Sequence, residues 1–194
     1  MQDRLDRRAV AERLLADRRD LLVVAGLGGT AWDVTAAGDH DLNFPLWGGM
    51  GNAAMVGLGL ALAQPERPVL VITGDGEMLM GLGALATIAV QAPANLSVIV
   101  FDNELYGETG RQATHTADGL DLAAMARGAG IKEVLMVSAM ADIDALAGRV
   151  HERRGPLVAQ VKISDEPGPL VLPPRDGPHL KTRFRRALLG EEAV

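Results

Sequence analysis

The sequence contains no cysteine, few aromatic residues and no excess of positive charge. Without cysteine, the chain has no disulfide, no cysteine-ligated zinc or iron–sulfur cluster and no thiol nucleophile. Lysine and arginine number 19 against 25 aspartate and glutamate residues, and the resulting net charge of −6 argues against a nucleic-acid-binding surface. With 48% hydrophobic residues, the 194-residue chain is too apolar to be disordered and long enough to form one domain.

Long hydrophobic runs are also missing. The most apolar stretches, residues 53–63 and 79–90, are only about a dozen residues long and contain glycine, whereas a membrane-spanning helix needs about 20 apolar residues. The amino-terminal residues are too charged for a signal peptide. These absences predict a cytoplasmic protein that binds neither a membrane nor nucleic acid.

Apolar strand-like segments alternate with helix-like segments along the chain. The expected strands are residues 21–25, 68–73, 96–101, 134–137 and 157–163. The expected helices between them are residues 52–63, 77–90, 120–128 and 141–153. Continuously apolar strands are buried on both faces, so the sequence predicts an α/β fold: a doubly wound, mostly parallel sheet with helices on both faces. Ligands of such sheets bind at the carboxyl ends of the strands.

The two ends of the chain differ from this core, which we expect over about residues 20–165 of a single domain formed by residues 1–194. Residues 1–20 are predicted to be helical, and residues 166–194 form a tail that begins as a proline-rich loop. Phe184 and two later leucines at helical spacing predict that the tail docks on the body or on a partner. The histidines outside any motif are expected to be surface residues, although a partner's active site could use the first of them; they are His40, His151 and His179.

Two polar turns follow neighbouring strands of the predicted sheet. Gly74, Asp75 and Gly76 come after the strand 68–73, and Asn103 follows the strand 96–101. Glycines let backbone N–H groups approach a ligand, and a helix that begins at Glu77 directs its free N–H groups to the same place. Magnesium prefers a carboxylate or two together with phosphate oxygens. The Asp75 carboxylate and the Asn103 amide oxygen could therefore bind one Mg²⁺ ion.

The spacing of these residues resembles the thiamine-diphosphate binding motif of the decarboxylase and acetolactate-synthase superfamily. Between the Gly74-Asp75-Gly76 triplet and Asn103 lie 26 residues. The resemblance implies a thiamine-diphosphate-binding fold of the PP (cofactor-binding) type. It also implies that Asp75 and Asn103 hold Mg²⁺ and that the backbone carbonyl of Leu105 is a third ligand.

Two further segments are similar to parts of the same family. Residues 47–54 resemble the segment that holds the aminopyrimidine ring, which implies that Met50 lies beneath the thiazolium and imposes a bent cofactor shape. The Gly48 carbonyl would accept a hydrogen bond from the exocyclic amine, and the Met50 N–H would donate to a ring nitrogen. Gly48 and Met50 are therefore expected to assist catalysis, because the bend lets the cofactor promote its own deprotonation. Residues 25–30 resemble the first strand-end loop, with Thr30 near the diphosphate or the substrate.

The resemblance implies a set of cofactor contacts in these loops. They are Gly29, Thr30, Gly48, Met50, Gly74, Asp75, Gly76, Glu77, Met78, Asn103, Leu105 and Tyr106. Two residues depart from the family pattern. Glu77 stands where many decarboxylases have serine or threonine, and its carboxylate is expected to point away from phosphate while its N–H binds. Glu104 stands directly after the metal asparagine, where the family has a more polar residue. This departure bears on the identity of the substrate more than on that of the cofactor.

The resemblance covers roughly residues 20–165, which in the family is the PP domain alone. The PYR (pyrimidine-binding) domain supplies the glutamate that protonates the aminopyrimidine ring, so a PYR-domain α subunit is the expected partner in a hetero-oligomer. Residues 102–114 look most like the β subunits of sulfopyruvate decarboxylase and the related phosphonopyruvate decarboxylase. Arg111 and His115 could provide cationic donors for the second anionic group of such substrates.

The implied activity is that of a thiamine-diphosphate- and Mg²⁺-dependent 2-oxo-acid decarboxylase, a lyase that yields an aldehyde and CO₂. Sulfopyruvate- or phosphonopyruvate-like acids are the expected substrates. A carboligase or a 2-oxo-acid oxidoreductase subunit with the same cofactor is an alternative. A non-catalytic diphosphate-binding module is an alternative of another class.

Overall fold

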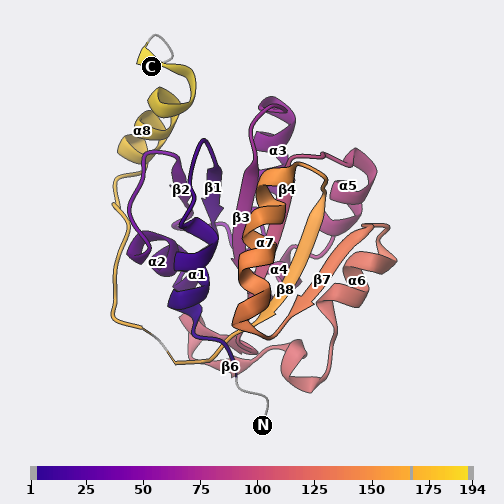
Figure 1. The fold of residues 1–194 in the computed structure, drawn as a ribbon. Helices are drawn as coiled ribbons and strands as arrows, with labels where there is room; N and C mark the ends of the chain where they lie inside the picture. The colour runs from indigo at the N-terminus through magenta and orange to yellow at the C-terminus, as the bar shows by residue number, and fades with distance from the viewer. Residues whose placement is uncertain (1–3, 167, 192–194) are drawn as a thin grey trace.

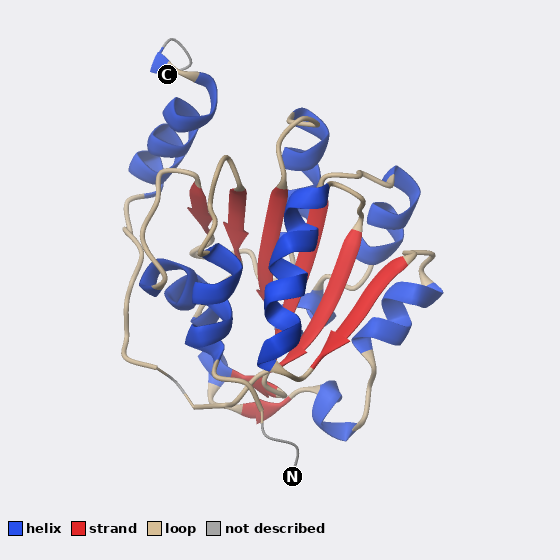
Figure 2. Cartoon of the chain, in the orientation of Figure 1, coloured by secondary structure: helices blue, strands red, loops and turns tan. Residues whose placement is uncertain are grey.

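The computed structural model describes residues 4–166 and 168–191, so residues 1–3, 167 and 192–194 of the expected domain lie outside the described residues. A six-stranded sheet runs through the molecule with helices on both faces (Figures 1 and 2). Its order is β2 (Asn43–Pro45), β1 (Leu22–Ala25), β3 (Val69–Gly74), β4 (Leu96–Asp102), β8 (Leu157–Lys162) and β7 (Glu133–Val137), and every neighbouring pair is parallel. The predicted doubly wound α/β fold is confirmed.

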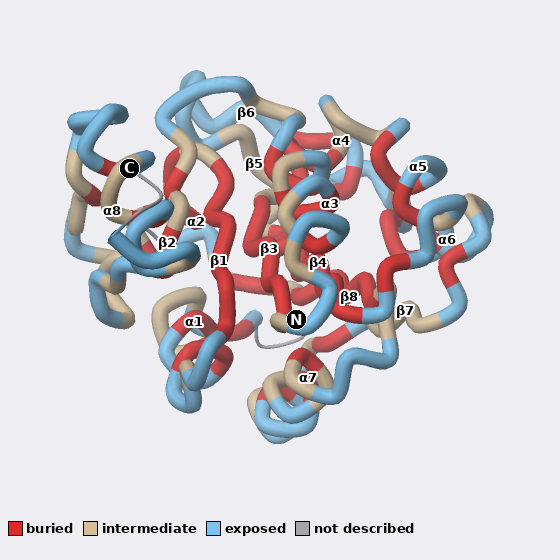
Figure 3. The backbone as a smooth tube through the Cα atoms, turned by 90° about the horizontal axis from the view of Figure 1, so that it is seen from above, coloured by how far each residue is buried: buried red, intermediate tan, exposed pale blue. Residues whose placement is uncertain are grey.

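The sheet separates two hydrophobic clusters, because successive side chains of a strand point to opposite faces. In β3, Leu70 and Ile72 pack in one cluster and Val69 and Val71 in the other. The first face is covered by α1 (Arg7–Leu15), α2 (Gly29–Ala36) and α7 (Met140–Glu152). The second is covered by α3 (Ala53–Ala63), α4 (Asp75–Met80), α5 (Ala84–Gln91) and α6 (Leu122–Gly128). Figure 3 shows the buried strands between these two layers.

The five predicted strands are present, but before β4 the structure adds two elements and divides a third. The helix α2 and the edge strand β2 lie between β1 and α3, where the sequence pattern predicted neither. The prediction of a single helix over residues 77–90 is wrong. This segment forms two helices, α4 and α5, and α4 already begins at Asp75. The break falls at Gly81, where an added Cβ would lie 1.9 Å from the Gly51 carbonyl oxygen, so the chain there packs backbone against backbone.

Both ends of the described chain pack on the body. In α1, Val10, Ala11 and Leu14 are buried, so the hydrophobic core extends beyond residues 20–165. The last helix, α8 (Gly177–Leu189), packs beside β2, and the Phe184 ring meets Phe44 edge to face at 5.4 Å between ring centroids. The tail therefore docks on the body of its own chain. No helix of the described residues is both long and apolar enough to cross a membrane.

The contact of α3 with the sheet gives a prediction for stability. A Cβ on Gly57 would lie 2.1 Å from Cγ2 of Val71, whereas one on Gly59, in the same helix, would meet nothing within 4 Å. Replacing Gly57 with alanine is expected to lower the free energy of unfolding by about 1–3 kcal/mol through overpacking. The matched change Gly59→Ala should raise it by up to about 1 kcal/mol, because alanine favours a helix. Urea denaturation of both variants tests the pair, and equal effects would contradict it.

Candidate functional site

A cleft opens at the carboxyl edge of the sheet, where the order of the strands reverses. After β1 the chain continues through α2 to β2 on one side, and after β3 it continues through α4 and α5 to β4 on the other. Such a switch point leaves a crevice between the two connections, which is where ligands of open α/β sheets bind. The cleft has a volume of about 140 Å³ and is lined by the turns after β1, β3 and β4.

Most of the predicted cofactor residues line this cleft. They are Gly29, Thr30, Met50, Gly74, Asp75, Gly76, Glu77, Asn103, Leu105 and Tyr106, and Arg111 lines it too. Three predicted site residues are not in its wall. Gly48 is exposed, Met78 is buried in the second hydrophobic cluster because its side chain faces the core side of α4, and His115 is exposed at the start of a short 3-10 turn, residues 115–118.

Asp75 is the first residue of α4 and is only 1% exposed. Its Oδ2 accepts hydrogen bonds from the hydroxyl groups of Thr114 (2.5 Å) and Thr116 (3.1 Å). Burial raises the pKa of Asp75, and the two hydroxyls oppose that shift. Because both hydroxyls donate to one oxygen, Oδ1 is left without a side-chain donor among the described residues. A buried carboxylate with one oxygen free of side-chain donors is suited to binding a cation.

Asn103 and Leu105 form the turn after β4. The Asn103 Oδ1 accepts a hydrogen bond from the Leu105 N–H at 3.2 Å, and Glu104 between them has a φ of +64°. The strand β5 (Leu105–Tyr106) then pairs antiparallel with β6 (Gln112–Ala113). The Glu104 carbonyl accepts a hydrogen bond from the Thr114 N–H, and the Tyr106 carbonyl accepts one from the Arg111 N–H. Since successive carbonyls of a strand point in opposite directions, the Leu105 carbonyl is turned away from β6. The Leu105 carbonyl therefore makes no hydrogen bond in the pairing of β5 with β6.

The donor set fits Mg²⁺ bound together with a diphosphate. It offers a carboxylate oxygen, an amide oxygen and a backbone carbonyl, all hard oxygen ligands of the kind that Mg²⁺ takes. Among the described residues, no group of three histidine, aspartate or glutamate side chains could hold a metal ion. An ion at Asp75 would therefore need oxygens from a ligand, as Mg²⁺ commonly takes from phosphates.

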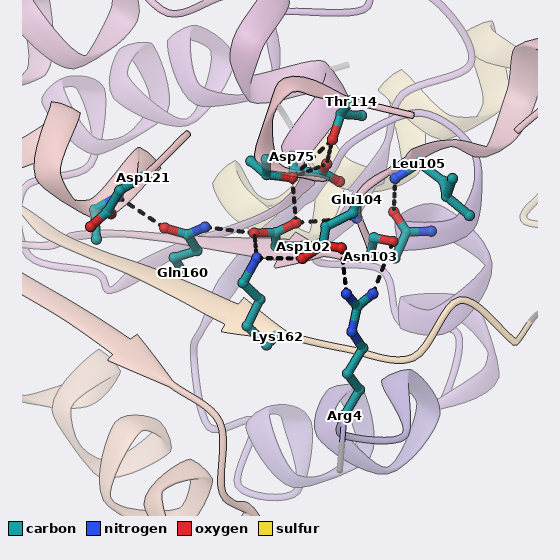
Figure 4. Close-up of polar contacts among 12 residues, drawn as sticks. Arg4, Asp75, Asp102, Asn103, Glu104, Leu105, Thr114, Asp121, Gln160 and Lys162 are labelled. Carbon is teal, nitrogen blue, oxygen red and sulfur yellow. Dashed lines mark hydrogen bonds and ion pairs between the residues drawn. The ribbon is translucent and has the colours of Figure 1, made fainter. Parts of the chain in front are cut away.

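Asp102 is a buried residue of this edge that the sequence analysis missed. It is fully buried, and its Oδ1 accepts from the Thr116 hydroxyl at 2.8 Å, while its Oδ2 accepts from Gln160 Nε2 at 2.5 Å and Lys162 Nζ at 2.7 Å. Figure 4 shows Asp102 between Asp75 on one side and Gln160 and Lys162 on the other. Burial alone would lower the pKa of Lys162, but hydrogen bonds to Asp102 and Glu104 raise it. The Thr116 hydroxyl thus lies between the Asp75 carboxylate and the Asp102–Lys162 ion pair.

Glu77 lies at the base of the cleft and is 4% exposed. Its Oε2 accepts a hydrogen bond from the Thr73 hydroxyl at 2.9 Å and occupies the space beside Gly26, where a Cβ would come within 1.9 Å. Burial raises the pKa of Glu77. The carboxyl group is thus held against the ends of β1 and β3, beneath the loops that line the cleft.

The remaining polar residues of the motifs have varied surroundings. The Arg111 guanidinium forms an ion pair with Asp165 at 2.8 Å, and both side chains are about half exposed. The Tyr106 ring packs against Gly76, where a Cβ would lie 2.5 Å from the ring. His40 is half-buried rather than fully exposed, because its Nδ1 accepts a hydrogen bond from the Leu42 N–H at 3.0 Å.

Comparison with known proteins gives the chain clear relatives. Residues 31–161 match the model of the thiamine pyrophosphate enzyme C-terminal TPP binding domain. The chain is 35% identical over 186 residues to the sulfopyruvate decarboxylase subunit beta of Methanothermobacter thermautotrophicus, which covers 96% of this chain and 97% of that protein. It is 44% identical over 141 residues to the phosphonopyruvate decarboxylase of Streptomyces viridochromogenes, covering 72% of this chain but only 35% of the relative.

A solved structure has the same fold as this chain. The crystal structure of benzoylformate decarboxylase from Polynucleobacter necessarius superimposes with a TM-score of 0.69 at 22% identity, over 87% of this chain and 36% of that one. At this identity the likeness concerns the fold alone. The chain therefore spans about a third of the length of this structure and of the Streptomyces relative.

Proposed function

Because the chain belongs to the thiamine pyrophosphate enzyme family and corresponds to the C-terminal TPP-binding domain of those enzymes, we propose that it is the cofactor-binding β subunit of a heteromeric 2-oxo-acid decarboxylase. Its substrates are 2-oxo acids with a second anionic group, of the sulfopyruvate or phosphonopyruvate type, and its products an aldehyde and CO₂. The observation that carries this proposal is the buried Asp75 carboxylate at the switch point of the sheet, in one cleft with Asn103 and Leu105.

The residues of the cleft divide the work of binding. Asp75, Asn103 and the Leu105 carbonyl would hold Mg²⁺, and the turns at residues 29–30 and 74–78 would hold the diphosphate. Gly48 and Met50 would orient the aminopyrimidine end. When bound, thiamine diphosphate supplies the nucleophilic carbon and the electron sink for loss of CO₂. The protein then contributes orientation, fixed charges and exclusion of water.

Two features support a partner subunit that completes the site. The cleft volume of about 140 Å³ is below the roughly 300–1,000 Å³ of ordinary small-molecule pockets, so a cofactor would extend beyond this chain. Helices α3 and α5 pack against each other and contain no charged residue. Their exposed side chains include Met55, Leu62 and Val90. An apolar surface of this kind is typical of a protein interface, and we assign it to a PYR-domain α subunit.

Co-expression with a PYR-domain chain tests the proposal. CO₂ release should be measured from sulfopyruvate, phosphonopyruvate and pyruvate, with each chain alone and with both together. Release only by the combined chains, with Mg²⁺ and thiamine diphosphate present, is the expected result. Turnover that requires an acceptor would instead indicate a carboligase or an oxidoreductase. Cofactor uptake by calorimetry without turnover in any combination would indicate a non-catalytic module.

Arg111 gives a prediction about substrate preference. If its guanidinium contacts the second anionic group, Arg111→Ala should raise KM for sulfopyruvate or phosphonopyruvate more than for pyruvate. An exposed charge pair contributes up to about 1 kcal/mol, so the difference should not exceed about fivefold. The matched control is Arg13→Ala, because Arg13 forms a similarly exposed pair with Asp144 away from the cleft. An equal change of KM for all substrates would remove Arg111 from the substrate site.

A further inference from the structure

We propose that Arg7 forms an oxyanion-binding subsite in the wall of the cleft, held in place by the buried carboxylate of Asp33. The ligand chemistry is a tetrahedral oxyanion. Its source is either the terminal phosphate of the cofactor or the sulfonate or phosphonate group of the substrate. The choice between these sources rests on the proposed function, but the subsite itself does not.

Asp33 holds two arginines of α1 at once. It lies on α2 and is 1% exposed. Its Oδ2 accepts from Arg7 Nε at 2.6 Å and its Oδ1 from Arg8 Nε at 2.7 Å. The two arginine side chains are themselves only 13% and 16% exposed. Two guanidinium groups share one carboxylate, so the cluster has an excess positive charge of one.

The two arginines differ in where their remaining nitrogens lie. Arg8 Nη2 donates to the Pro169 carbonyl at 2.6 Å, which fixes it to the segment before α8. Arg7 instead lines the cleft. Its guanidinium lies against Gly29, where an added Cβ would be 2.1 Å from Nη2 and 2.8 Å from Cζ. In the described part of the chain, the hydrogen bond of Arg7 is made through Nε, so both Nη groups remain available to a ligand.

This arrangement is suited to an oxyanion. The Nη1–Nη2 edge of a guanidinium can donate to two oxygens of one phosphate, phosphonate or sulfonate group. Because Asp33 already fixes Nε, little side-chain entropy remains to be lost on binding. Arg111, the other arginine of the cleft wall, is instead half exposed and paired with Asp165. Arg7 is therefore the better-ordered cation of the two.

Binding of simple anions to the full chain tests the subsite without a partner and without turnover. The probes are inorganic pyrophosphate and methylphosphonate, and the readout is NMR titration of the Gly29 N–H signal, which is present in every variant and lies against the Arg7 guanidinium. Arg7→Gln should weaken binding of at least one probe about tenfold, the effect of a lost charge-assisted hydrogen bond. The matched control is Arg8→Gln, which also removes one guanidinium from Asp33 but does not alter the cleft. Equal affinities of the two variants for both probes would overturn the proposal.

A second measurement separates the two sources. If Arg7 binds the cofactor, Arg7→Gln should lower the affinity for Mg²⁺–thiamine diphosphate about tenfold in calorimetry, and methylphosphonate should compete with the cofactor. If it binds the substrate, cofactor affinity should be unchanged, and methylphosphonate should still bind to the cofactor-saturated chain. Should Arg7→Gln fail to fold, Arg7→Lys keeps the charge but loses the two-pronged edge, and it should still bind the probes more weakly than Arg8→Gln. This test is independent of the proposed function. A chain that is inactive with every partner can still bind the probes through Arg7, and an active decarboxylase can bind them without Arg7.

Discussion

Replacing Asp75 with asparagine is expected to weaken the Mg²⁺-dependent binding of thiamine diphosphate by more than about 100-fold. Loss of a residue that only supports a metal ligand already costs about 10–100-fold in metal affinity, and Asp75 supplies the one carboxylate of the proposed ligand set. The amide keeps the shape of the side chain, and its oxygen can still accept from the Thr114 and Thr116 hydroxyls that bind Oδ2. Isothermal titration calorimetry with and without Mg²⁺ measures the effect.

The same variant should fold as well as the parent chain. Burial raises the pKa of Asp75, so the folded chain without a cation disfavours the charged form, and a neutral amide removes that cost. The melting temperature without ligand should therefore be unchanged or higher. Asp118→Asn, an exposed acid in the turn at residues 115–118, is the control and should leave cofactor affinity intact. Normal Mg²⁺-dependent binding by Asp75→Asn would exclude Asp75 as the metal ligand.

Replacing Asp102 with asparagine is expected to lower the free energy of unfolding by about 2–4 kcal/mol. Breaking a buried ion pair costs roughly 3–5 kcal/mol when the remaining charge is buried, and Lys162 keeps 26% of its side chain exposed, which reduces the loss. The change also places an amide N–H₂ group among donors from Thr116, Gln160 and Lys162. Urea denaturation at neutral pH measures the difference.

The matched control for Asp102 is an exposed pair. Asp165 and Arg111 are 52% and 50% exposed, so Asp165→Asn should cost no more than about 1 kcal/mol. Because the Thr116 hydroxyl lies between Asp102 and Asp75, the Asp102 variant should weaken cofactor binding as well. Equal stabilities of the Asp102 and Asp165 variants would show that the buried pair contributes no more than a surface one.

The sequence was most informative where local pattern and packing agree. The strands β1, β3, β4 and β8 are almost wholly buried and the edge strand β7 is partly buried, and their apolar runs predicted all five to within about two residues. The strand β2 has three residues and ends in a proline, which is too short a pattern to detect. The break between α4 and α5 depends on the Gly51 carbonyl, which is distant in sequence, so helix periodicity alone could not reveal it.

The sequence predicted the motif residues of the candidate site but not the residues that hold them in place. The turns at residues 74–76 and 103–105 were recognised by spacing, and the structure brings them into one cleft. The contacts of Asp75 with Thr114 and Thr116 span 39 and 41 residues, and that of Arg7 with Asp33 spans 26. Nothing local in the sequence distinguishes such partners from solvent-exposed polar residues. The Thr-x-Thr pair directly after β6, Thr114 and Thr116, was the available signal for the first of these contacts.

The path of the first described residues has a practical consequence for purification. Leu5 pairs with Ile163 beyond the end of β8, and Arg4 bonds to Asn103 and Glu104 in the turn after β4. Figure 1 shows α8 at the opposite end of the molecule from β6. An affinity tag fused ahead of Arg4 would sit at the mouth of the crevice and compete with its ligands. A tag appended after α8 would leave that mouth clear, and binding assays should use the latter.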